Sequence, residues 1–527
     1  MLSTGNPKQE LAEKPETWAI PHRVLMQKLG HGWPGSSVDV ARDFVSRWSA
    51  LLNCDIEVRE TGDSFIAFRS DLGAIRFSGM EEARCLLVSG RPDEAVETAT
   101  SFWHEANSPR KAVVVVAANR DVEAAIRAAL PTARLAIFGP DTAVALMEDE
   151  SPIEHLKRAI RAQVALRRLI PFDTEHPIEG PMFCGRTRML NRLLEEEDVN
   201  FAVAGPGRIG KTSLLRRFRY TSLRSGDRSA ASRYYIDLMP CRQTNADGLA
   251  QFIALKIGGG SKVSRLTCDR LEPFLTFQRA HHGRPVDLLL DETDEYLNLE
   301  TFQFLGNAAR KGLCRLVLAG RGELLRTVLS KDSRLHNRME LLRLDPLSEP
   351  EAAALLAGPL EDLGFTFSRK LEVLAQVLGL TGKLPQYVQF YGRRICELMI
   401  DGVFKTIDSA VIHWIRDEFE TVQMFSGPIF EVKAPKTRFA ALALLGTGHR
   451  ALTLPQIQGI LHHQGLLATV DEVWELANEL VIQNTLAWNQ GKFQIANESL
   501  PYYAHTHEFF GSAMRELRKQ ISPGLSH

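Results

Sequence analysis

The sequence predicts an α/β fold: a parallel sheet followed by an all-helical segment and a winged helix, and preceded by a smaller α/β unit. Three observations predict this order. Five strand-like apolar runs alternate with helical patterns between residues 200 and 344, as in a parallel sheet wrapped by helices. Residues 348–425 show only helical patterns, beginning at the capping-box spacing of Ser348 and Glu351. Residues 437–500 show three helices and then the turn Asn-Gln-Gly-Lys-Phe.

The composition is that of an ordinary globular protein. The chain has 527 residues and a net charge of -1, so no overall field attracts it to nucleic acid or to an anionic membrane. The 7 cysteines are scattered and form no Cys-x-x-Cys pair, which argues against a disulfide framework and a zinc site. The polar N-terminus and the lack of a long apolar run predict no signal peptide and no membrane span. We expect a cytoplasmic protein.

The N-terminal part is expected to hold a flexible tail, residues 1–20, and a small α/β domain, residues 21–150. Apolar residues at helical spacing predict a helix over residues 38–52. The continuous apolar run 111–118 predicts a strand that is buried on both faces. The other expected elements are strands at 55–60, 64–70, 74–79 and 134–139 and helices at 92–105, 121–130 and from 142 onward.

Residues 151–180 are expected to connect this domain to the rest. Residues 151–170 predict one basic amphipathic helix, and a proline-rich linker follows it. The basic residues of this helix are Lys157, Arg158, Arg161, Arg167 and Arg168. Beyond the linker we expect a sheet-based core at 181–346, a helical lid at 347–430, and a winged helix with a C-terminal helix at 431–527. The core strands are expected at 200–204, 233–239, 286–291, 314–319 and 340–344.

A phosphate-binding loop lies at the start of the core. Residues 205–212 fit the pattern Gly-x-x-x-x-Gly-Lys-Thr, between an expected strand and an expected helix. Such a loop directs backbone N–H groups and a helix N-terminus at an anion. Lys211 is expected to reach the outer phosphates and Thr212 to ligate Mg²⁺; the alternative is a glycine-rich turn without a ligand. The expected nucleotide contacts are Gly205, Pro206, Gly207, Arg208, Ile209, Gly210, Lys211, Thr212 and Ser213.

Acidic and basic partners for this loop follow two later strands. Asp291 is expected on the Mg²⁺ side and Glu292 as the base that orients the attacking water; the alternative is an acidic helix cap. Arg321 ends another strand and is expected to contact the γ-phosphate, the alternative being a surface arginine. Asp294 and Glu295 are interpreted as solvated charges.

Four stretches together resemble the STAND group of P-loop ATPases, the relatives of AAA+ proteins that include NB-ARC and NACHT switches. They are the phosphate loop, the run Leu-Leu-Leu-Asp-Glu-Thr-Asp, Met182–Leu194 and Thr381–Gln389. The resemblance implies that the lead-in residues Phe183, Gly185 and Arg186 lie near the adenine and that Pro385 touches the base. Met189 stands where the family usually has Glu.

The resemblance also implies a function. In the family the winged helix folds onto ADP in a closed state, ATP and a trigger open the molecule, and it then oligomerises. We therefore expect ATP/ADP and Mg²⁺ as cofactors, slow hydrolysis, and a role in prokaryotic defence or stress signalling. The expected partners are further copies of the chain and, through the N-terminal domain, a protein or a nucleic acid.

DNA binding through the winged helix is the main alternative. The expected recognition helix, residues 470–483, carries four acidic residues and no Lys or Arg, so we favour an intramolecular clamp over DNA reading. Its apolar residues are interpreted as a buried face: Val470, Val473, Trp474, Ala477, Leu480 and Val481. The alternative function is a DNA-handling AAA+-like ATPase, of the replication-initiator (Orc) or transposition-helper kind. It would assemble on DNA through the winged helix or through the basic helix.

The N-terminal domain resembles the Mrr-type restriction-endonuclease-like fold. Such a site needs an Asp, for which Asp63 is the candidate, and Glu or Gln with Lys on the next strand. The expected strand there, residues 74–79, carries neither. The resemblance therefore implies a degenerate domain that acts as a sensor, a docking module or a nucleic-acid holder. A nuclease with an ATPase regulator is the third hypothesis, and the missing Lys counts against it.

Overall fold

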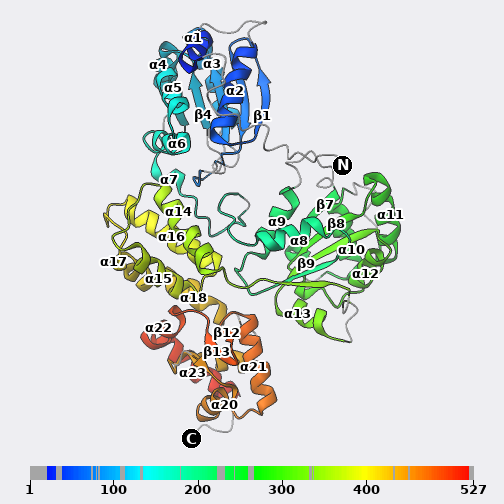
Figure 1. The fold of residues 1–527 in the computed structure, drawn as a ribbon. Helices are drawn as coiled ribbons and strands as arrows, with labels where there is room; N and C mark the ends of the chain where they lie inside the picture. The colour runs from blue at the N-terminus through cyan, green and yellow to red at the C-terminus, as the bar shows by residue number, and fades with distance from the viewer. Residues whose placement is uncertain are drawn as a thin grey trace, which may run out of the picture.

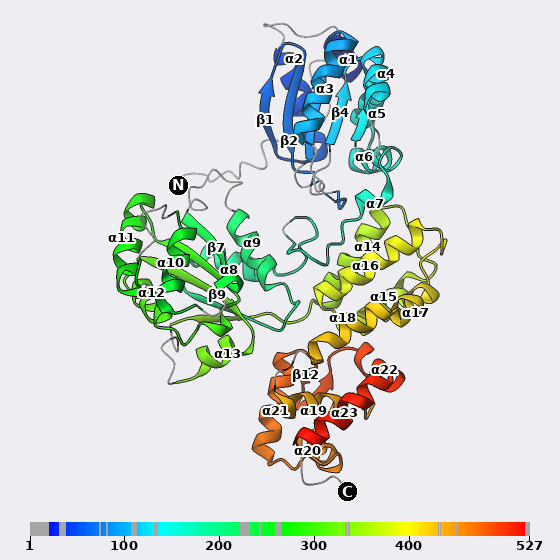
Figure 2. The same cartoon turned by 180° about the vertical axis from the view of Figure 1, so that it is seen from behind.

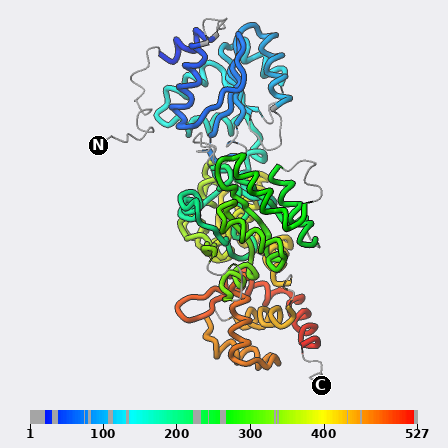
Figure 3. The backbone as a smooth tube through the Cα atoms, turned by 90° about the vertical axis from the view of Figure 1, so that its right-hand side faces the viewer, coloured from blue at the N-terminus to red at the C-terminus, as the bar shows by residue number. Residues whose placement is uncertain are grey.

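The chain was analysed as a computed structural model (Figures 1–3). It describes residues 21–30, 38–72, 75–78, 80, 83–106, 113–130, 135–178, 180–221, 232–241, 244–258, 266–331, 335, 338–430, 432, 434–448 and 451–521. The N-terminal sheet lies at one end of the molecule, the core and the helical lid lie in the middle, and the C-terminal helices lie at the other end (Figure 3). The expected tail, residues 1–20, falls outside the described residues.

The N-terminal unit is built on a five-stranded sheet in the order β1-β2-β3-β4-β5. The pairs β1–β2 and β2–β3 are antiparallel, whereas β3–β4 and β4–β5 are parallel. Buried aliphatic side chains fill β4 and β5 on both faces, because helices pack over the sheet. The elements are α1 His22–Gly30, α2 Val38–Leu52, β1 Ile56–Thr61, β2 Phe65–Ser70, β3 Ala83–Val88, α3 Pro92–Ala106, β4 Val113–Ala117, α4 Arg120–Ala129, β5 Leu135–Phe138 and α5 Pro140–Glu148.

Most elements predicted for this unit are confirmed, and one strand is wrong. The segment 74–79 forms no strand in its described residues; Ile75 and Phe77 are nevertheless buried. Their alternation with polar neighbours reflects a loop that turns apolar side chains inward, not a paired strand. The third strand is instead β3, a buried run that the prediction missed.

The predicted basic helix 151–170 is also wrong as a single helix. The structure has two helices, α6 Pro152–Arg161 and α7 Leu166–Leu169. The break lies where Gln163 turns toward the N-terminal sheet. Its side-chain oxygen accepts hydrogen bonds from the Ile137 N–H at 2.9 Å and from Arg127 at 3.1 Å.

The core contains a five-stranded parallel sheet in the order β10-β6-β9-β8-β7, which confirms the five predicted strands. An additional strand, β9, lies between the strand of the phosphate loop and the strand that ends in Asp291. The elements are α8 Thr187–Glu195, β6 Phe201–Ala204, α9 Lys211–Thr221, β7 Arg233–Asp237, α10 Ala246–Lys256, α11 Leu271–His282, β8 Val286–Asp291, α12 Glu300–Arg310, β9 Cys314–Gly320, α13 Gly322–Leu329 and β10 Glu340–Arg343, with short 3-10 turns at Met239–Cys241, Cys268–Arg270 and Thr293–Glu295.

A buried charge cluster explains the acidic residue inside β8. The carboxylate of Asp287 lies 3.2 Å from Arg233 and 4.0 Å from Arg315, and all three side chains are almost fully buried. Because removing one member would leave an uncompensated buried charge, this cluster fixes the register of the three neighbouring strands.

Helices alone form the segment after the sheet, as predicted: α14 Glu349–Asp362, α15 Lys370–Thr381, α16 Pro385–Ile400, α17 Ser409–Asp417 and α18 Phe419–Phe430. The capping box of Ser348 and Glu351 is present at the start of α14. The C-terminal segment then has the predicted order of three helices and a hairpin, with a small sheet in the order β11-β13-β12. Its elements are α19 Pro435–Leu445, β11 Ala451–Leu452, α20 Leu454–His463, α21 Val470–Ile482, β12 Leu486–Asn489, β13 Lys492–Ile495, α22 Ser499–Thr506 and α23 Glu508–Ile521.

Candidate nucleotide-binding site

The phosphate loop has the predicted context: β6 ends at Ala204 and α9 begins at Lys211. Gly210 adopts φ +98°, a conformation that favours glycine. A Cβ on Gly205 would lie 3.1 Å from the backbone oxygen of Leu344, so a side chain there would push the loop off β10. The backbone of the loop and its packing against the residue after β10 therefore favour glycine at both positions.

Lys211 is buried, with 6% of its surface exposed. Its ammonium donates to the backbone oxygens of Gly205 at 3.0 Å and Pro206 at 2.9 Å. Burial lowers the pKa of Lys211 to about 8. Two neutral carbonyls are weak partners for a buried cation, so an anion in the loop would stabilise the charged form.

Thr212 and Asp291 meet as predicted for a metal site. The Thr212 hydroxyl donates to Oδ2 of Asp291 at 2.6 Å, and Tyr235 donates to the same oxygen at 3.0 Å. Oδ1 of Asp291 accepts the backbone N–H of Glu292 at 3.0 Å. A hydroxyl and a carboxylate are the ligand types that Mg²⁺ takes beside phosphate oxygens. The loop and these two side chains therefore fit a nucleoside triphosphate with Mg²⁺.

Tyr235 is a site residue that the sequence analysis missed. It lies on β7, which pairs with β8 beside Asp291, and the guanidinium of Arg216 lies 5.0 Å from the centre of its ring. The available signal was the strand alternation. Tyr235 is two residues before Asp237, the residue opposite Asp291, so it shares that face of the sheet.

Glu292 and Arg321 lie at the same end of the sheet. Glu292 is half-buried in a left-handed conformation, φ 55° and ψ 47°. Burial raises the pKa of its carboxyl, and the Arg321 guanidinium opposes that rise. A Cβ on Gly207 would lie 3.8 Å from Cζ of Arg321, which puts this arginine beside the phosphate loop. The geometry is compatible with the predicted roles of a base and a phosphate contact.

The interpretation of Asp294 as a solvated charge is wrong. Its carboxylate accepts the backbone N–H groups of Arg321 at 2.6 Å and Leu324 at 3.0 Å, so it caps the start of α13 and fixes Arg321. Glu295 is exposed, as expected.

The lead-in residues pack where the core meets the lid. Gly185 has φ +68°, and a Cβ there would lie 2.9 Å from Cδ2 of Leu347. Arg186 donates to the backbone oxygens of Asp345 and Ile209. Phe183 lies half-buried two residues before Gly185.

The proline of the lid reaches the same junction. Pro385 begins α16, directly after Lys383 and Leu384, and the N–H of Leu347 donates to the Lys383 oxygen at 3.1 Å. On the other side of the loop, the Ser213 hydroxyl accepts the N–H of Ile178 at 3.0 Å. The structure thus brings the lead-in, the phosphate loop and the proline together; the base contacts of Phe183, Gly185, Arg186 and Pro385 stay predictions.

Arg208 connects the phosphate loop to the lid. It donates to the Met424 backbone oxygen at 2.7 Å, and its guanidinium lies 5.7 Å from the centre of the Tyr387 ring. Tyr387 in turn stacks on Phe425, with ring centres 4.1 Å apart. Both aromatic residues were missed, because nothing in the sequence joins α16 and α18 to the loop.

A cavity of about 220 Å³ adjoins this contact, and the C-terminal segment closes one side of it. It is lined by Gly207, Arg208 and Arg321 from the core and by residues of the lid and of the turn after α21. Two side-chain atoms in that turn, Oε1 of Gln483 and Nδ2 of Asn484, are buried without a hydrogen-bond partner among the described residues. Three segments of the chain therefore enclose one polar space beside the phosphate loop.

Helix α21 packs against the core next to Arg321. A Cβ on Gly322 would lie 2.6 Å from Cγ2 of Ile482, and Arg326 of α13 forms an ion pair with Glu479. A cleft of about 1580 Å³ separates the rest of α21 from the core. The predicted buried face of α21 is confirmed for Val473, Ala477 and Leu480. It is wrong for Val470 and Trp474, which stay exposed because they face outward or into the cleft.

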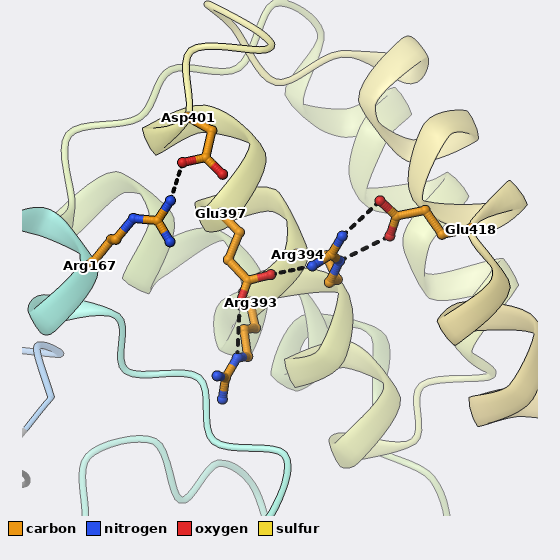
Figure 4. A network of polar contacts seen from close by, with 6 residues as sticks. All are labelled: Arg167, Arg393, Arg394, Glu397, Asp401 and Glu418. Atoms are coloured by element: carbon orange, nitrogen blue, oxygen red, sulfur yellow. Dashed lines mark hydrogen bonds and ion pairs between the residues drawn. The ribbon is translucent and has the colours of Figure 1, made fainter.

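The basic residues of α6 and α7 bind the lid. Lys157 donates to Asp362 at 2.7 Å, Arg161 donates to the Asp362 backbone oxygen at 2.7 Å, and Arg167 forms an ion pair with Asp401 (Figure 4). Figure 4 also shows the adjoining pairs of α16, in which Arg393 and Arg394 contact Glu397 and Arg394 contacts Glu418. Three of the charges predicted to serve nucleic acid thus contact the lid, and a fourth, Arg158, forms an ion pair with Asp149.

The N-terminal sheet does not form the nuclease arrangement that the Mrr resemblance requires. Asp63 is exposed in the turn between β1 and β2, and the segment expected to lie beside it is not a strand. Across the described part of the chain, no group of three or more His, Cys, Asp and Glu side chains is placed to hold a metal ion.

Of the comparisons with known proteins, only the one with solved structures gave matches. No protein-family model matches the sequence, and no curated protein matches it. Among solved structures, the Walker-type ATPase of Pyrococcus abyssi is similar over 61% of this chain and 96% of its own, at 14% identity and a TM-score of 0.48. The ORC2 protein of Aeropyrum pernix, solved in ADPNP–ADP complexes, covers 64% of this chain and 93% of its own at 14% identity and TM-score 0.43.

A third similar structure is the ORC1 protein of the same organism in complex with DNA, at 17% identity and TM-score 0.36, over 63% of this chain and 94% of that one. The sheet order and the geometry of the phosphate loop assign the core to the P-loop NTPase fold. Within the described residues, no helix is long and apolar enough to cross a bilayer.

Proposed function

We propose that the protein is an ATP-binding and slowly hydrolysing switch of the STAND type, in which the bound nucleotide sets how the C-terminal winged helix docks on the core and whether the chain oligomerises. The observation that carries the proposal is the position of α21. It contacts α13 through Gly322 and Arg326, one and five residues after Arg321. Loss or gain of the γ-phosphate beside Arg321 would therefore act next to the contact between α13 and α21 that closes the molecule.

The chain's own residues have distinct tasks in this proposal. With a nucleotide bound, the Lys211 ammonium would exchange the two loop carbonyls for phosphate oxygens, and the Thr212 hydroxyl would turn from Asp291 to help hold Mg²⁺. The metal would supply positive charge that neutralises the phosphates. Glu292 orients the attacking water and takes its proton; burial raises the pKa of this carboxyl, which suits a base. Asp294 holds the backbone of Arg321 in place.

Charge couples the nucleotide to the closed arrangement. The cleft beside α21 is lined by seven carboxylates and three cations: Glu292, Asp294, Glu295, Glu323, Glu472, Glu475 and Glu479 against Arg321, Arg326 and Lys436. A γ-phosphate adds negative charge at the core side of this cleft, so it repels the acidic face of α21 more than ADP does. By linkage, a closed α21 weakens ATP relative to ADP by the same factor.

The test is the nucleotide content and the mass of the purified chain, measured by mass photometry with ADP, with ATP–Mg²⁺, and with ATP plus duplex DNA. A monomer that holds ADP and stays closed in ATP alone supports a switch that awaits a trigger. A Glu292→Gln variant should bind ATP and hold the active form. If that variant hydrolyses ATP at the wild-type rate, the assignment of Glu292 is wrong.

A DNA-handling ATPase is the alternative, and the same experiment separates the two. Its two expected contact surfaces are the acidic helix α21, which faces the core, and the basic helices α6 and α7, of which Lys157, Arg161 and Arg167 bind the lid. Assembly that requires duplex DNA would favour this alternative over the switch.

A further inference from the structure

We propose that the cleft between α21 and the core, together with the aromatic surface at its rim, is a docking site for a basic, extended segment of a partner protein. The proposal goes beyond the nucleotide switch, because it assigns a binding partner to the cleft. Glu292 and Arg321 of the nucleotide site lie on the core side of the cleft, and the aromatic surface lies on α21 and the hairpin. It rests on three observations: an exposed aromatic cluster, an excess of carboxylates and the size of the cleft.

The aromatic cluster lies on α21 and the hairpin. Trp474 and Trp488 are 44% and 48% exposed, and their rings meet edge to face with centres 5.7 Å apart. The buried ring of Phe493 packs against both tryptophans, with ring centres 5.9 Å from Trp474 and 4.5 Å from Trp488. Val470, one turn before Trp474 on the same helix, is also exposed, as is Leu467, which precedes the helix. Large exposed apolar side chains that are neighbours in space mark interaction surfaces.

Charge selects the occupant. The cleft has an excess of four negative charges, and only some of its acids are neutralised within the chain. Glu479 pairs with Arg326 and Glu472 lies 3.8 Å from Lys436. By contrast, Glu295 and Glu475 form no ion pair with any residue that the structure describes. Together with Asp471, exposed beside Glu475, they attract cations and repel phosphates.

The combination of aromatic faces with carboxylates is specific for Lys and Arg. A guanidinium or ammonium gains from stacking on a tryptophan and from a nearby carboxylate at once. A nucleic acid would meet the acids with its phosphates, so the charge of the cleft favours a basic peptide over a nucleic acid. The cleft volume, about 1580 Å³, exceeds the range of about 300–1000 Å³ that small molecules occupy. An extended peptide segment with Lys or Arg next to apolar residues fits these features.

Such a segment would compete with the contact that closes the molecule. A Lys or Arg of the partner that approaches Glu479 takes the place of Arg326, and an apolar side chain beside Ile482 separates α21 from Gly322. The partner therefore competes directly with the contact between α21 and α13.

The experiment uses the full chain and a fluorescein-labelled peptide of three Lys-Leu-Arg repeats, with a Glu-Leu-Glu peptide of the same length as the charge-reversed probe. Binding is followed by fluorescence anisotropy. We expect the basic peptide to bind and the acidic peptide not to bind. Trp474→Ala and Glu475→Lys should each weaken the basic peptide roughly tenfold, the size of one desolvated cation–π contact or one charge pair.

Matched controls exclude general effects of charge and aromatic content. Trp414 on α17 is 55% exposed and packs on Phe404, outside the cleft, so Trp414→Ala should leave binding unchanged. Asp269 is an exposed acid that does not line the cleft, so Asp269→Lys should also leave binding unchanged. The proposal is overturned if both peptides bind alike, if neither binds, or if Trp474→Ala matches the Trp414→Ala control. Nucleotide binding by Trp474→Ala should equal the wild type, which separates this outcome from a failure of the switch.

Discussion

The guanidinium of Arg326 is paired with the carboxylate of Glu479, although 153 residues separate them along the chain. Arg326 lies on α13, which starts at the residue after Arg321, and Glu479 lies on α21. The pair is partly exposed, at 52% and 27% of the two side chains, so it contributes at most about 1 kcal/mol. A contact of this strength can be broken by a nucleotide or a partner.

Gly322, which lies beside that ion pair, offers a substitution that should separate α21 from α13. In Gly322→Ala, the new Cβ would lie 2.6 Å from the branched side chain of Ile482, so α21 has to move away. The substitution suits a helix, so the core should keep its stability. We expect the variant to favour ATP over ADP and to show a larger radius of gyration in small-angle scattering.

The matched control for that variant is Gly306→Ala on α12, where a Cβ would meet nothing within 4 Å. It should scatter and bind nucleotides like the wild type. If Gly322→Ala also keeps the wild-type radius and the wild-type preference for ADP, the closed arrangement does not depend on α21.

Removing the lysine of the phosphate loop should abolish nucleotide binding. Lys211→Ala deletes the only lysine side chain of the loop and leaves the carbonyls of Gly205 and Pro206 facing the phosphates. Calorimetric titration should show at least a hundredfold loss of ATP affinity, about 2.7 kcal/mol. The exposed Lys256→Ala on α10 is the control and should bind normally. Retained binding in Lys211→Ala would contradict the site.

The hydroxyl of Tyr235 should matter for Mg²⁺ rather than for the nucleotide. Tyr235→Phe removes the 3.0 Å hydrogen bond that holds Oδ2 of Asp291, so this carboxylate loses one of its orienting donors. We expect ATPase activity to require about tenfold more Mg²⁺, while metal-free nucleotide binding stays unchanged.

A neighbouring tyrosine supplies the control for that measurement. Tyr234 bonds His282 instead, at 2.8 Å, so Tyr234→Phe should leave the Mg²⁺ requirement unaltered. Equal Mg²⁺ requirements for the two phenylalanine variants would rule out a positioning role for Tyr235.

The attachment of α6 to the lid should depend on one carboxylate. Asp362→Ala leaves the Lys157 ammonium, whose side chain is 8% exposed, with a single acidic partner, Glu154. We expect a loss of about 3 kcal/mol in the free energy of unfolding, measured by urea titration. The exposed pair of Arg167 and Asp401 is the comparison: Asp401→Ala should cost less than about 1 kcal/mol. Equal losses would contradict the importance of burial at Lys157.

The parts of the fold that depend on local pattern could be predicted from the sequence. The strand–loop–helix of residues 201–221 and the acids that follow β8 are fixed by short-range signals: an apolar run, glycines and a helix start. The same signals failed at residues 74–79, where Ile75 and Phe77 alternate with polar residues in a buried loop. An alternation of apolar and polar residues indicates which side chains are buried, but it does not show that a neighbouring strand is available for pairing.

Other features could not be predicted because their partners are distant in the chain. The basic residues of α6 and α7 suggested a nucleic-acid surface, but one of the two acids that pair with Lys157, Asp362, lies 205 residues later. Trp474 has the spacing of a core residue, yet it faces the cleft. Its aromatic neighbours, Trp488 and Phe493, belong to the hairpin and are distant from it in the sequence. A single sequence records charge and hydrophobicity and does not record which surfaces meet.

The attachment of α6 and α7 to the lid also has a mechanical consequence. Lys157, Arg161 and Arg167 contact the lid near the ends of α14 and α16, so α6 and α7 attach the N-terminal unit to the lid at two points. A rotation of the lid about its junction with the core would therefore move the N-terminal sheet with it. Because that sheet lies far from the junction, a small displacement at the phosphate loop would produce a larger displacement of the sheet.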